Sequence, residues 1–263
     1  MKNFYKYFFV SVLFSAFLCT SIIFAQDEQE QEEQSQKPKY FLIQSEKPFP
    51  DKVSDYEATQ KKVGAFIKKY NFDINWNAFS TDDHTYYYVS EINNLGDIDR
   101  MNEEFEKKST EESKKDFQNI NDSFNGIVDS YNTEVFMLSP NSYSPKEPIT
   151  KPEYQKYYKQ SIYFIKPYSE AKLTAALKDI KDFCEQNNIG LGYEIYANVL
   201  GNSNEIVFME GAKSPEDYKQ IMDELNSKYG DQFKPVWDKF MSLVKDTKSL
   251  DCWYRHDLST TKD

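Results

Sequence analysis

Histidine and cysteine are scarce in this chain of 263 residues, which holds two histidines and three cysteines. The histidines, His84 and His256, are far apart in the chain, and no cysteines show the short spacing of zinc ligands. The chain also lacks the fingerprints of P-loop, dinucleotide-binding, serine hydrolase and zinc protease sites. A metal centre is therefore not expected, and no single motif assigns a function.

An excess of positive charge is missing as well. The chain has 32 basic and 43 acidic residues, and its formal net charge is −11. Nucleic acids and anionic membranes reward clustered lysine and arginine. We therefore expect neither as a partner.

The longest uncharged run lies at the N-terminus. Lys2 and Lys6 precede a stretch without charge that ends on Ala25. This order predicts a secretory signal peptide over 1–25, although a run of this length could also be a retained membrane anchor. We expect an exported protein, periplasmic or extracellular, without a membrane span once the signal peptide is removed. Lipidation at Cys19 is not expected, because the residues before it are not small.

Two stretches predict linkers. Residues 26–38 are polar and acidic without one large apolar residue, so they cannot bury enough surface to offset the entropy of ordering. Residues 139–157 hold four of the ten prolines.

The cysteines left after cleavage at residue 25 are Cys184 and Cys252. Both fall in apolar patterns, and we expect buried free thiols. Export would permit a disulfide, and the spacing alone does not decide between the two.

The most informative feature is an internal repeat. Residues 72–80 align with 189–197 at an offset of 117, and the apolar positions around them align too. The aligned pairs include Val63 with Ile180, Phe66 with Phe183, Trp76 with Tyr193, Phe117 with Phe233 and Phe124 with Phe240. We interpret this as a duplication, the alternative being two unrelated domains that share a hydrophobic rhythm.

Each copy reads as strand–helix–strand–strand–helix–strand, over 39–138 and 158–260. The expected strands are 40–44, 74–80, 85–91 and 134–138, then 161–165, 191–198, 205–210 and 251–256. Apolar residues at helical spacing predict helices between them. Ser54 with Glu57 predicts a capping box, and Ser214 before Pro215 predicts a second helix start. The long helical region that follows is expected to break at 109–113 and at Gly230.

This element order predicts an α+β fold of two tandem ferredoxin-like βαββαβ repeats. The strands are apolar on both faces, so the two sheets are expected to cover each other as one barrel. The arrangement resembles the dimeric α/β-barrel superfamily, which includes antibiotic-biosynthesis-monooxygenase-like and NIPSNAP-like proteins. The resemblance covers nearly all of 39–260 and rests on element order and repeat spacing.

The resemblance implies a ligand pocket, for which haem and cofactor-free oxidation are the known uses. Haem-binding relatives supply a histidine from a helix, and neither histidine here falls on one, so no cofactor is expected. Cofactor-free oxygenases use Asn, Trp and His, and Asn75, Trp76 and Asn77 offer two of these types on one strand. Packing is the plainer explanation of Trp76.

Polar residues at strand ends are the other candidates for a pocket. A carboxylate near a guanidinium could orient a polar ligand, and a partly buried Glu or His could act as a general base. Ordinary solvent exposure would also explain such residues. The candidates for the ligand pocket are Trp76, Glu91, Glu194, Glu210, Arg255 and His256.

Pocket architecture without a catalytic set predicts a non-catalytic module that binds a small ligand or serves a structural role in the cell envelope. The alternative is a cofactor-independent, oxygenase-like barrel enzyme acting on a small aromatic substrate. Because two copies in one chain supply what relatives achieve by dimerising, we expect a monomer.

Overall fold

The structure is a computed structural model that describes residues 38–201 and 204–260. The predicted signal peptide and nearly all of the predicted acidic linker lie outside these residues. None of the described helices is long and apolar enough to cross a membrane.

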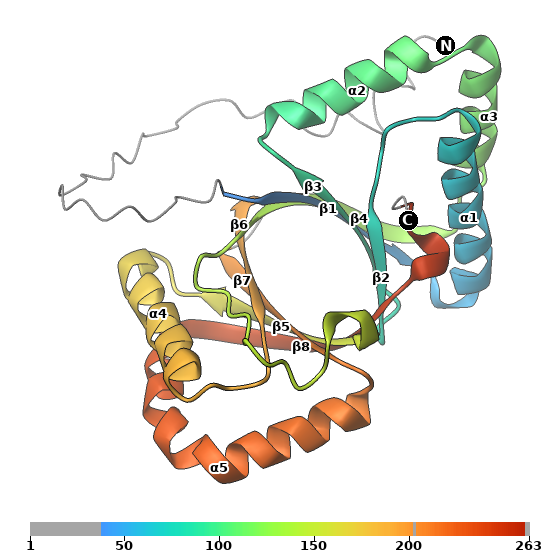
Figure 1. Cartoon of the computed structure of the whole chain (residues 1–263). Helices are drawn as coiled ribbons and strands as arrows, with labels where there is room; N and C mark the ends of the chain where they lie inside the picture. The colour runs from blue at the N-terminus through green and yellow to red at the C-terminus, as the bar shows by residue number, and fades with distance from the viewer. Residues whose placement is uncertain (1–37, 202–203, 261–263) are drawn as a thin grey trace. The chain divides into compact units, whose positions relative to one another are not determined.

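Eight antiparallel strands close into one barrel (Figure 1), in the order β1-β3-β2-β8-β5-β7-β6-β4. The strands are β1 (Tyr40–Pro48), β2 (Asn77–Thr81), β3 (Tyr86–Ile92), β4 (Val128–Leu138), β5 (Tyr157–Ile165), β6 (Glu194–Leu200), β7 (Glu205–Ala212) and β8 (Val244–Tyr254). In both halves of the chain the last strand lies beside the first, followed by the third and the second. The expected α+β fold and the barrel are confirmed.

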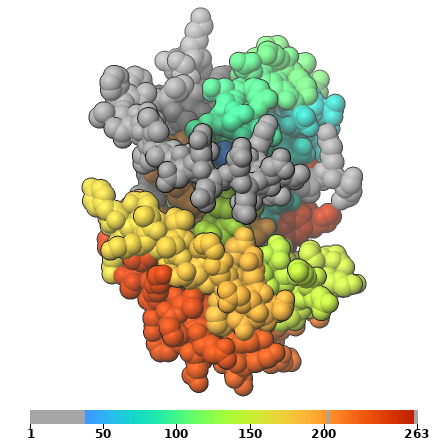
Figure 2. Space-filling model, turned by 60° about the vertical axis from the view of Figure 1, so that its left-hand side comes forward, coloured from blue at the N-terminus to red at the C-terminus, as the bar shows by residue number. Residues whose placement is uncertain are grey.

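Helices cover the outside of the barrel in two groups (Figure 1). They are α1 (Val53–Lys69), α2 (Gly96–Lys108) and α3 (Glu111–Asp122) in the first half, and α4 (Glu170–Gln186) and α5 (Pro215–Met241) in the second. In the space-filling view the surface of the second half is formed largely by α4, in yellow, and α5, in orange to red (Figure 2).

Alternation along the strands sends side chains to the helices or into the barrel. Phe136, Ile162, Val207 and Leu250 pack together inside the barrel. Their neighbours in sequence point outward, and Phe208 on β7 joins the core beneath α4 and α5. The strands are therefore apolar on both faces, as the sequence predicts, because both faces are covered.

The segment that follows the last strand of each half forms hydrogen bonds with the other half. After β4, Tyr143 exchanges two backbone hydrogen bonds with Tyr193, both 2.9 Å long. After β8, the backbone N–H of Thr260 donates to the carbonyl of Trp76 at 3.1 Å. The stretch 139–157 is thus more than a spacer, since part of it pairs with the second half.

Gly192 allows the segment after β4 to lie close to the second half. A Cβ on Gly192 would lie 2.8 Å from Cδ of Pro145 and 3.1 Å from the carbonyl oxygen of Tyr143. Any larger residue would push the segment after β4 away from its partner.

Several local expectations were wrong. α1 begins at Val53 after Lys52 without a side-chain cap, so Ser54 and Glu57 form no capping box. Gly230 does not interrupt α5, which runs on as a single helix, whereas the first half does break between α2 and α3. The Ser214 cap is confirmed, since its hydroxyl accepts from the N–H of Asp217 at 3.2 Å.

Both cysteines of the described part of the chain are free and buried, as expected. Cys184 lies in the core under α4 and α5, while Cys252 follows Leu250 by two residues and shares its inward direction. They lie on opposite faces of the sheet and cannot pair.

We expect Trp76→Phe to destabilise the fold by about 1–3 kcal/mol, the cost of leaving a buried polar group without its partner. The indole N–H of Trp76 donates to the carbonyl of Leu258 at 2.8 Å and so holds the C-terminal segment on the first half. Urea denaturation measures the change. Trp253→Phe, at a tryptophan that packs on Tyr157 with ring centroids 6.0 Å apart, is the control. Equal losses in the two variants would contradict the role given to this hydrogen bond.

Candidate functional site

A cavity of about 550 Å³ lies between the sheet of the second half and helices α4 and α5. This volume falls within the range of small-molecule sites, roughly 300–1,000 Å³. Strands β5 and β7 form its floor, α4 and the residues before β6 form one wall, and α5 forms the other. The cavity lies on the helix side of the sheet, outside the barrel.

Aromatic rings dominate the lining. The ring of Tyr163 stands edge-on to the rings of Phe208 and Trp237, with centroids 5.4 and 5.8 Å apart. The aromatic lining residues are Tyr163, Phe183, Tyr193, Phe208, Tyr218, Tyr229, Phe233 and Trp237. Such walls suit a flat, largely apolar ligand.

One carboxyl group lies in this aromatic surround. Glu210, on β7, accepts a hydrogen bond of 2.6 Å from the hydroxyl of Tyr218, in the first turns of α5. Burial raises the pKa of Glu210 above its ordinary value of 4.5, and the hydrogen bond from Tyr218 lowers it in part. A carboxyl group with a raised pKa and one fixed donor is a candidate general base.

Charged residues lie beside Glu210 on the same face of the sheet, outside the cavity lining. Lys159 on β5 lies opposite Glu210 on one side and Asp251 on the other. Its ammonium pairs with Asp251 at 2.9 Å, and Tyr157 donates to the same carboxylate at 2.7 Å. Lys159 is thereby engaged by Asp251 and exerts the smallest of the effects on the pKa of Glu210.

Two other buried groups of the cavity, Cys184 and Tyr163, stay protonated near neutral pH. Burial raises the pKa of the Cys184 thiol and of the Tyr163 hydroxyl to about 12 each. A protonated thiol is a poor nucleophile. Glu210 is therefore the group best suited to take a proton in this cavity.

Of the six candidates from the sequence, only Glu210 lines this cavity. Glu91 and Glu194 face the barrel interior, where the charges of both act on Tyr196 and raise its pKa after the larger effect of burial. Glu91 is exposed and lies 4.0 Å from Lys39, and Glu194 accepts from Tyr196 at 2.6 Å.

The remaining three candidates lie near the C-terminal segment. Trp76 precedes β2, packs against the core of the first half and donates to the carbonyl of Leu258. Arg255 pairs with Glu57 and with Asp257. His256 is exposed and begins a short 3-10 helix.

Sequence reasoning missed Tyr218, Tyr163 and Trp237 as members of the site. Trp237 belongs to the apolar stripe of a predicted helix, which gives no hint of a cavity. Tyr218 follows Glu210 by eight residues on a different element, and no spacing rule connects a strand with the helix that crosses it.

The residues present do not fit a haem held by a histidine. Of the described residues that line the cavity, none is a histidine. His84 lies in the turn between β2 and β3, and His256 lies beside Tyr254, with ring centroids 6.4 Å apart. Within 38–201 and 204–260, no group of three or more His, Cys, Asp or Glu residues could hold a metal ion.

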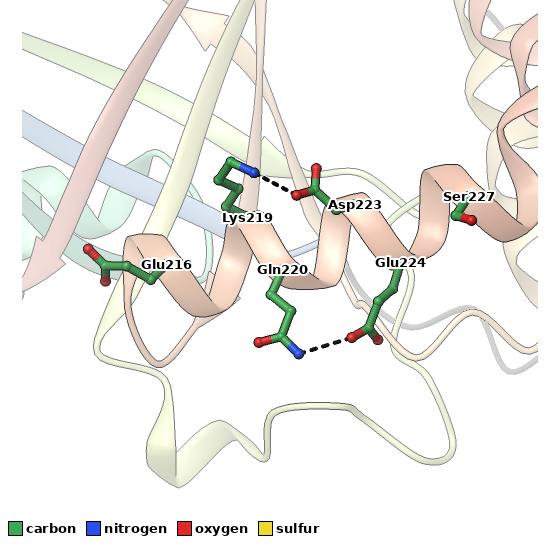
Figure 3. Close-up of a pocket in the computed structure, with 6 residues that line it drawn as sticks. All are labelled: Glu216, Lys219, Gln220, Asp223, Glu224 and Ser227. Carbon is green, nitrogen blue, oxygen red and sulfur yellow. Dashed lines mark hydrogen bonds and ion pairs between the residues drawn. The ribbon is translucent and has the colours of Figure 1, made fainter.

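A second depression lies along the solvent face of α5 (Figure 3). Its side chains project from one helix and pair with each other. Lys219 binds Asp223 at 2.6 Å, and Gln220 binds Glu224 at 3.0 Å. These are ordinary pairs at helical spacing, so we do not regard this surface as a site.

Comparison with known proteins identifies the fold. No protein-family model and no curated protein matches the chain. An anthrone oxidase-like protein of known structure is 12% identical, covers 87% of this chain and 95% of its own, and has a TM-score of 0.58. A monooxygenase-like protein from Lactobacillus acidophilus NCFM is 16% identical, covers 85% of this chain and 96% of its own, and has a TM-score of 0.50.

The chain therefore has the dimeric α/β-barrel fold, as the resemblance of its element order predicted. The expectation of a non-catalytic binding or structural module is corrected. The proteins with this fold are described as oxidase-like and monooxygenase-like, and the alternative of an oxygenase-like barrel fits them better. At these identities the likeness itself shows the fold alone.

We expect Glu210→Gln to change how stability depends on pH. With a raised pKa in the folded state, Glu210 stabilises the fold fully below its unfolded pKa, and this contribution is lost as pH rises through the folded pKa. The variant should therefore match the parent near pH 4 and become the more stable of the two toward pH 8, by about 1.4 kcal/mol for each unit of pKa shift.

Denaturation in urea at several pH values measures this difference. Glu91→Gln, at an exposed glutamate, is the control. A constant difference between Glu210→Gln and the parent across this pH range would contradict the buried, proton-binding carboxyl group.

Proposed function

We propose that the chain is an oxygenase-like enzyme that oxidises a small, flat aromatic substrate in the cavity under α4 and α5. The observation that carries the proposal is a single carboxyl group with a raised pKa, Glu210, enclosed by aromatic rings. The anthrone oxidase-like protein with the same fold suggests the substrate class, a fused aromatic ring system with an acidic CH₂ group.

The chemistry needs a base, a substrate and dioxygen. Glu210 takes a proton from the CH₂ group, and the aromatic rings of the substrate spread the resulting negative charge. The carbanion gives its electron pair to dioxygen and forms a C–O bond, and Glu210 returns the proton to the peroxide. Loss of water then breaks the O–O bond and leaves a carbonyl group, so CH₂ and O₂ become C=O and H₂O.

The chain's own residues support the proton transfer and the protection of the carbanion. Tyr218 fixes the orientation of the Glu210 carboxyl group through its hydrogen bond of 2.6 Å. Burial keeps water away from a carbanion that water would protonate. The proposal uses no bound cofactor, in keeping with the oxygenase-like alternative drawn from the sequence.

With anthrone as substrate, we expect Glu210→Gln to lower kcat about 10²–10⁴-fold, the usual contribution of a general base. The rate should fall as pH drops below the raised pKa of Glu210. Tyr218→Phe removes a hydrogen bond that lowers the pKa of Glu210. The acidic limb of the pH–rate profile of this variant should therefore lie at higher pH than in the parent. Oxygen consumption and product absorbance measure the rates.

Glu194→Gln is the matched control for charge, because Glu194 lies on the barrel side of β6 and outside the cavity. Turnover of anthrone that survives unchanged in Glu210→Gln would overturn the assignment of the base. Failure of the parent protein to turn over any anthrone-like or quinol-like compound would overturn the proposed function.

We also propose that the two halves are tandem ferredoxin-like repeats, 39–138 and 158–260, joined by 139–157. The support is the aligned sequence and the shared order of strands, with the last strand beside the first and the third beside the second in each half. A crystal structure in which the halves do not superpose strand for strand would contradict this.

Finally, we propose an exported monomer that has lost residues 1–25. The support is the sequence order of the first 25 residues and a barrel that one chain closes without a second copy. Native mass spectrometry of the protein from its own host should give one chain that lacks the signal peptide. A dimer mass would contradict the monomer. A mass that includes residues 1–25 would contradict the removal of the signal peptide.

A further inference from the structure

The mouth of the cavity can be located from the exposure of its lining. Of the described residues that line it, only Asn226, Asp231 and Lys234 are exposed. All three lie on α5 within one turn of Gly230, which also lines the cavity. The other lining residues are buried or half-buried. Solvent therefore reaches the cavity across α5 at Gly230.

Helical geometry directs position 230 into this mouth. Residues four apart lie above one another on a helix, so Asn226, Gly230 and Lys234 share one face of α5. A Cβ added to Gly230 would meet no heavy atom within 4 Å. A larger side chain here would therefore extend into open space at the mouth instead of into packed neighbours.

The fold itself gives no reason for glycine at this position. Glycine in a helix interior costs about 1 kcal/mol relative to alanine, and here a methyl group would have room. Pro235 weakens the same stretch, because it lacks the N–H that would bond to the carbonyl of Asp231. Gly230 itself lines the cavity that holds Glu210, and the carbonyl that Pro235 leaves without its helical N–H belongs to Asp231, another lining residue.

We propose that Gly230 is the specificity-determining residue at the entrance to the site, and we name Asn226, Gly230, Asp231 and Lys234 the portal. The missing side chain at 230 leaves the opening through which a flat aromatic molecule reaches Glu210. Which compounds pass depends on the width left at this position. The proposal rests on the proposed function for the nature of the substrate, while the portal concerns access to the cavity.

Cys184 provides a probe of access that does not depend on catalysis, since it lines the cavity and is a free thiol. Methyl methanethiosulfonate is small enough to enter. The sulfur of Cys184 would attack its sulfenyl sulfur, methanesulfinate would leave, and the thiol proton would pass to solvent. Cys252, inside the barrel, reports in the same sample on routes other than the portal.

The experiment compares Gly230→Leu with Gly230→Ala in the mature full-length protein and follows both thiols by peptide mass spectrometry. Alanine and leucine both favour the helix, but only leucine fills the mouth. We expect Gly230→Leu to slow modification of Cys184 roughly tenfold relative to Gly230→Ala, because the two variants share the same slowly reacting thiol and differ in the access of the reagent to it. Cys252 should react at one rate in all variants.

Ser227→Leu is a second control, since Ser227 lies on the solvent face of α5 away from the cavity (Figure 3). Equal rates at Cys184 in the two Gly230 variants would overturn the portal. So would a parent protein in which Cys184 reacts no faster than Cys252. If Gly230→Leu protects Cys184 but no variant oxidises anthrone, the portal stands and the proposed function falls.

Discussion

Closure of the barrel is the constraint on which the rest of the structure depends. Each strand has two hydrogen-bonded neighbours, so no sheet edge is left open. The two joints between the halves are short. β2 and β8 pair from Phe79 to Thr81, and β4 and β6 pair over four positions with an irregularity beside Val135. The segments that follow β4 and β8 extend these joints by hydrogen bonding to the opposite half.

Closure also decides where a ligand can bind. Inside the barrel, Phe136, Ile162, Val207 and Leu250 pack against each other. The outward faces of the same strands need helices to cover them. The cavity that holds Glu210 lies under this cover in the second half, between the sheet and helices α4 and α5.

The two halves treat a half-buried carboxyl group in opposite ways. In the first half, Glu46 accepts from both Tyr56 and Gln60, at 2.6 and 2.8 Å, and Tyr56 also bonds to Tyr88. That cluster satisfies its own polar groups under α1. In the second half, Glu210 accepts a hydrogen bond from Tyr218, its one such side-chain partner in the described part of the chain, and borders open space. The same fold thus surrounds one carboxyl group with hydrogen-bond donors and leaves the other facing a cavity.

Much of this architecture could be predicted from the sequence, because strand alternation and helical spacing are local properties. The strand–helix order, the two-sided apolar strands and the Ser214 cap follow from neighbouring residues. So does the burial of Cys184 and Cys252. The failed capping box at Ser54 shows the limit of such rules, since α1 begins at Val53, two residues before the start that a cap at Ser54 would give.

Glu210 is the one residue of the site that the sequence predicted. The residues around Glu210 could be identified only from the tertiary structure. The sequence places Glu91 and Glu210 at the ends of corresponding strands and Glu194 in the middle of another strand. Register decides that two of them face the barrel and the third faces the helices. A one-residue difference in phase reverses that choice. The sequence by itself determined which residues could be buried, and only the packing of α5 across β7 decided which buried carboxyl group borders a cavity.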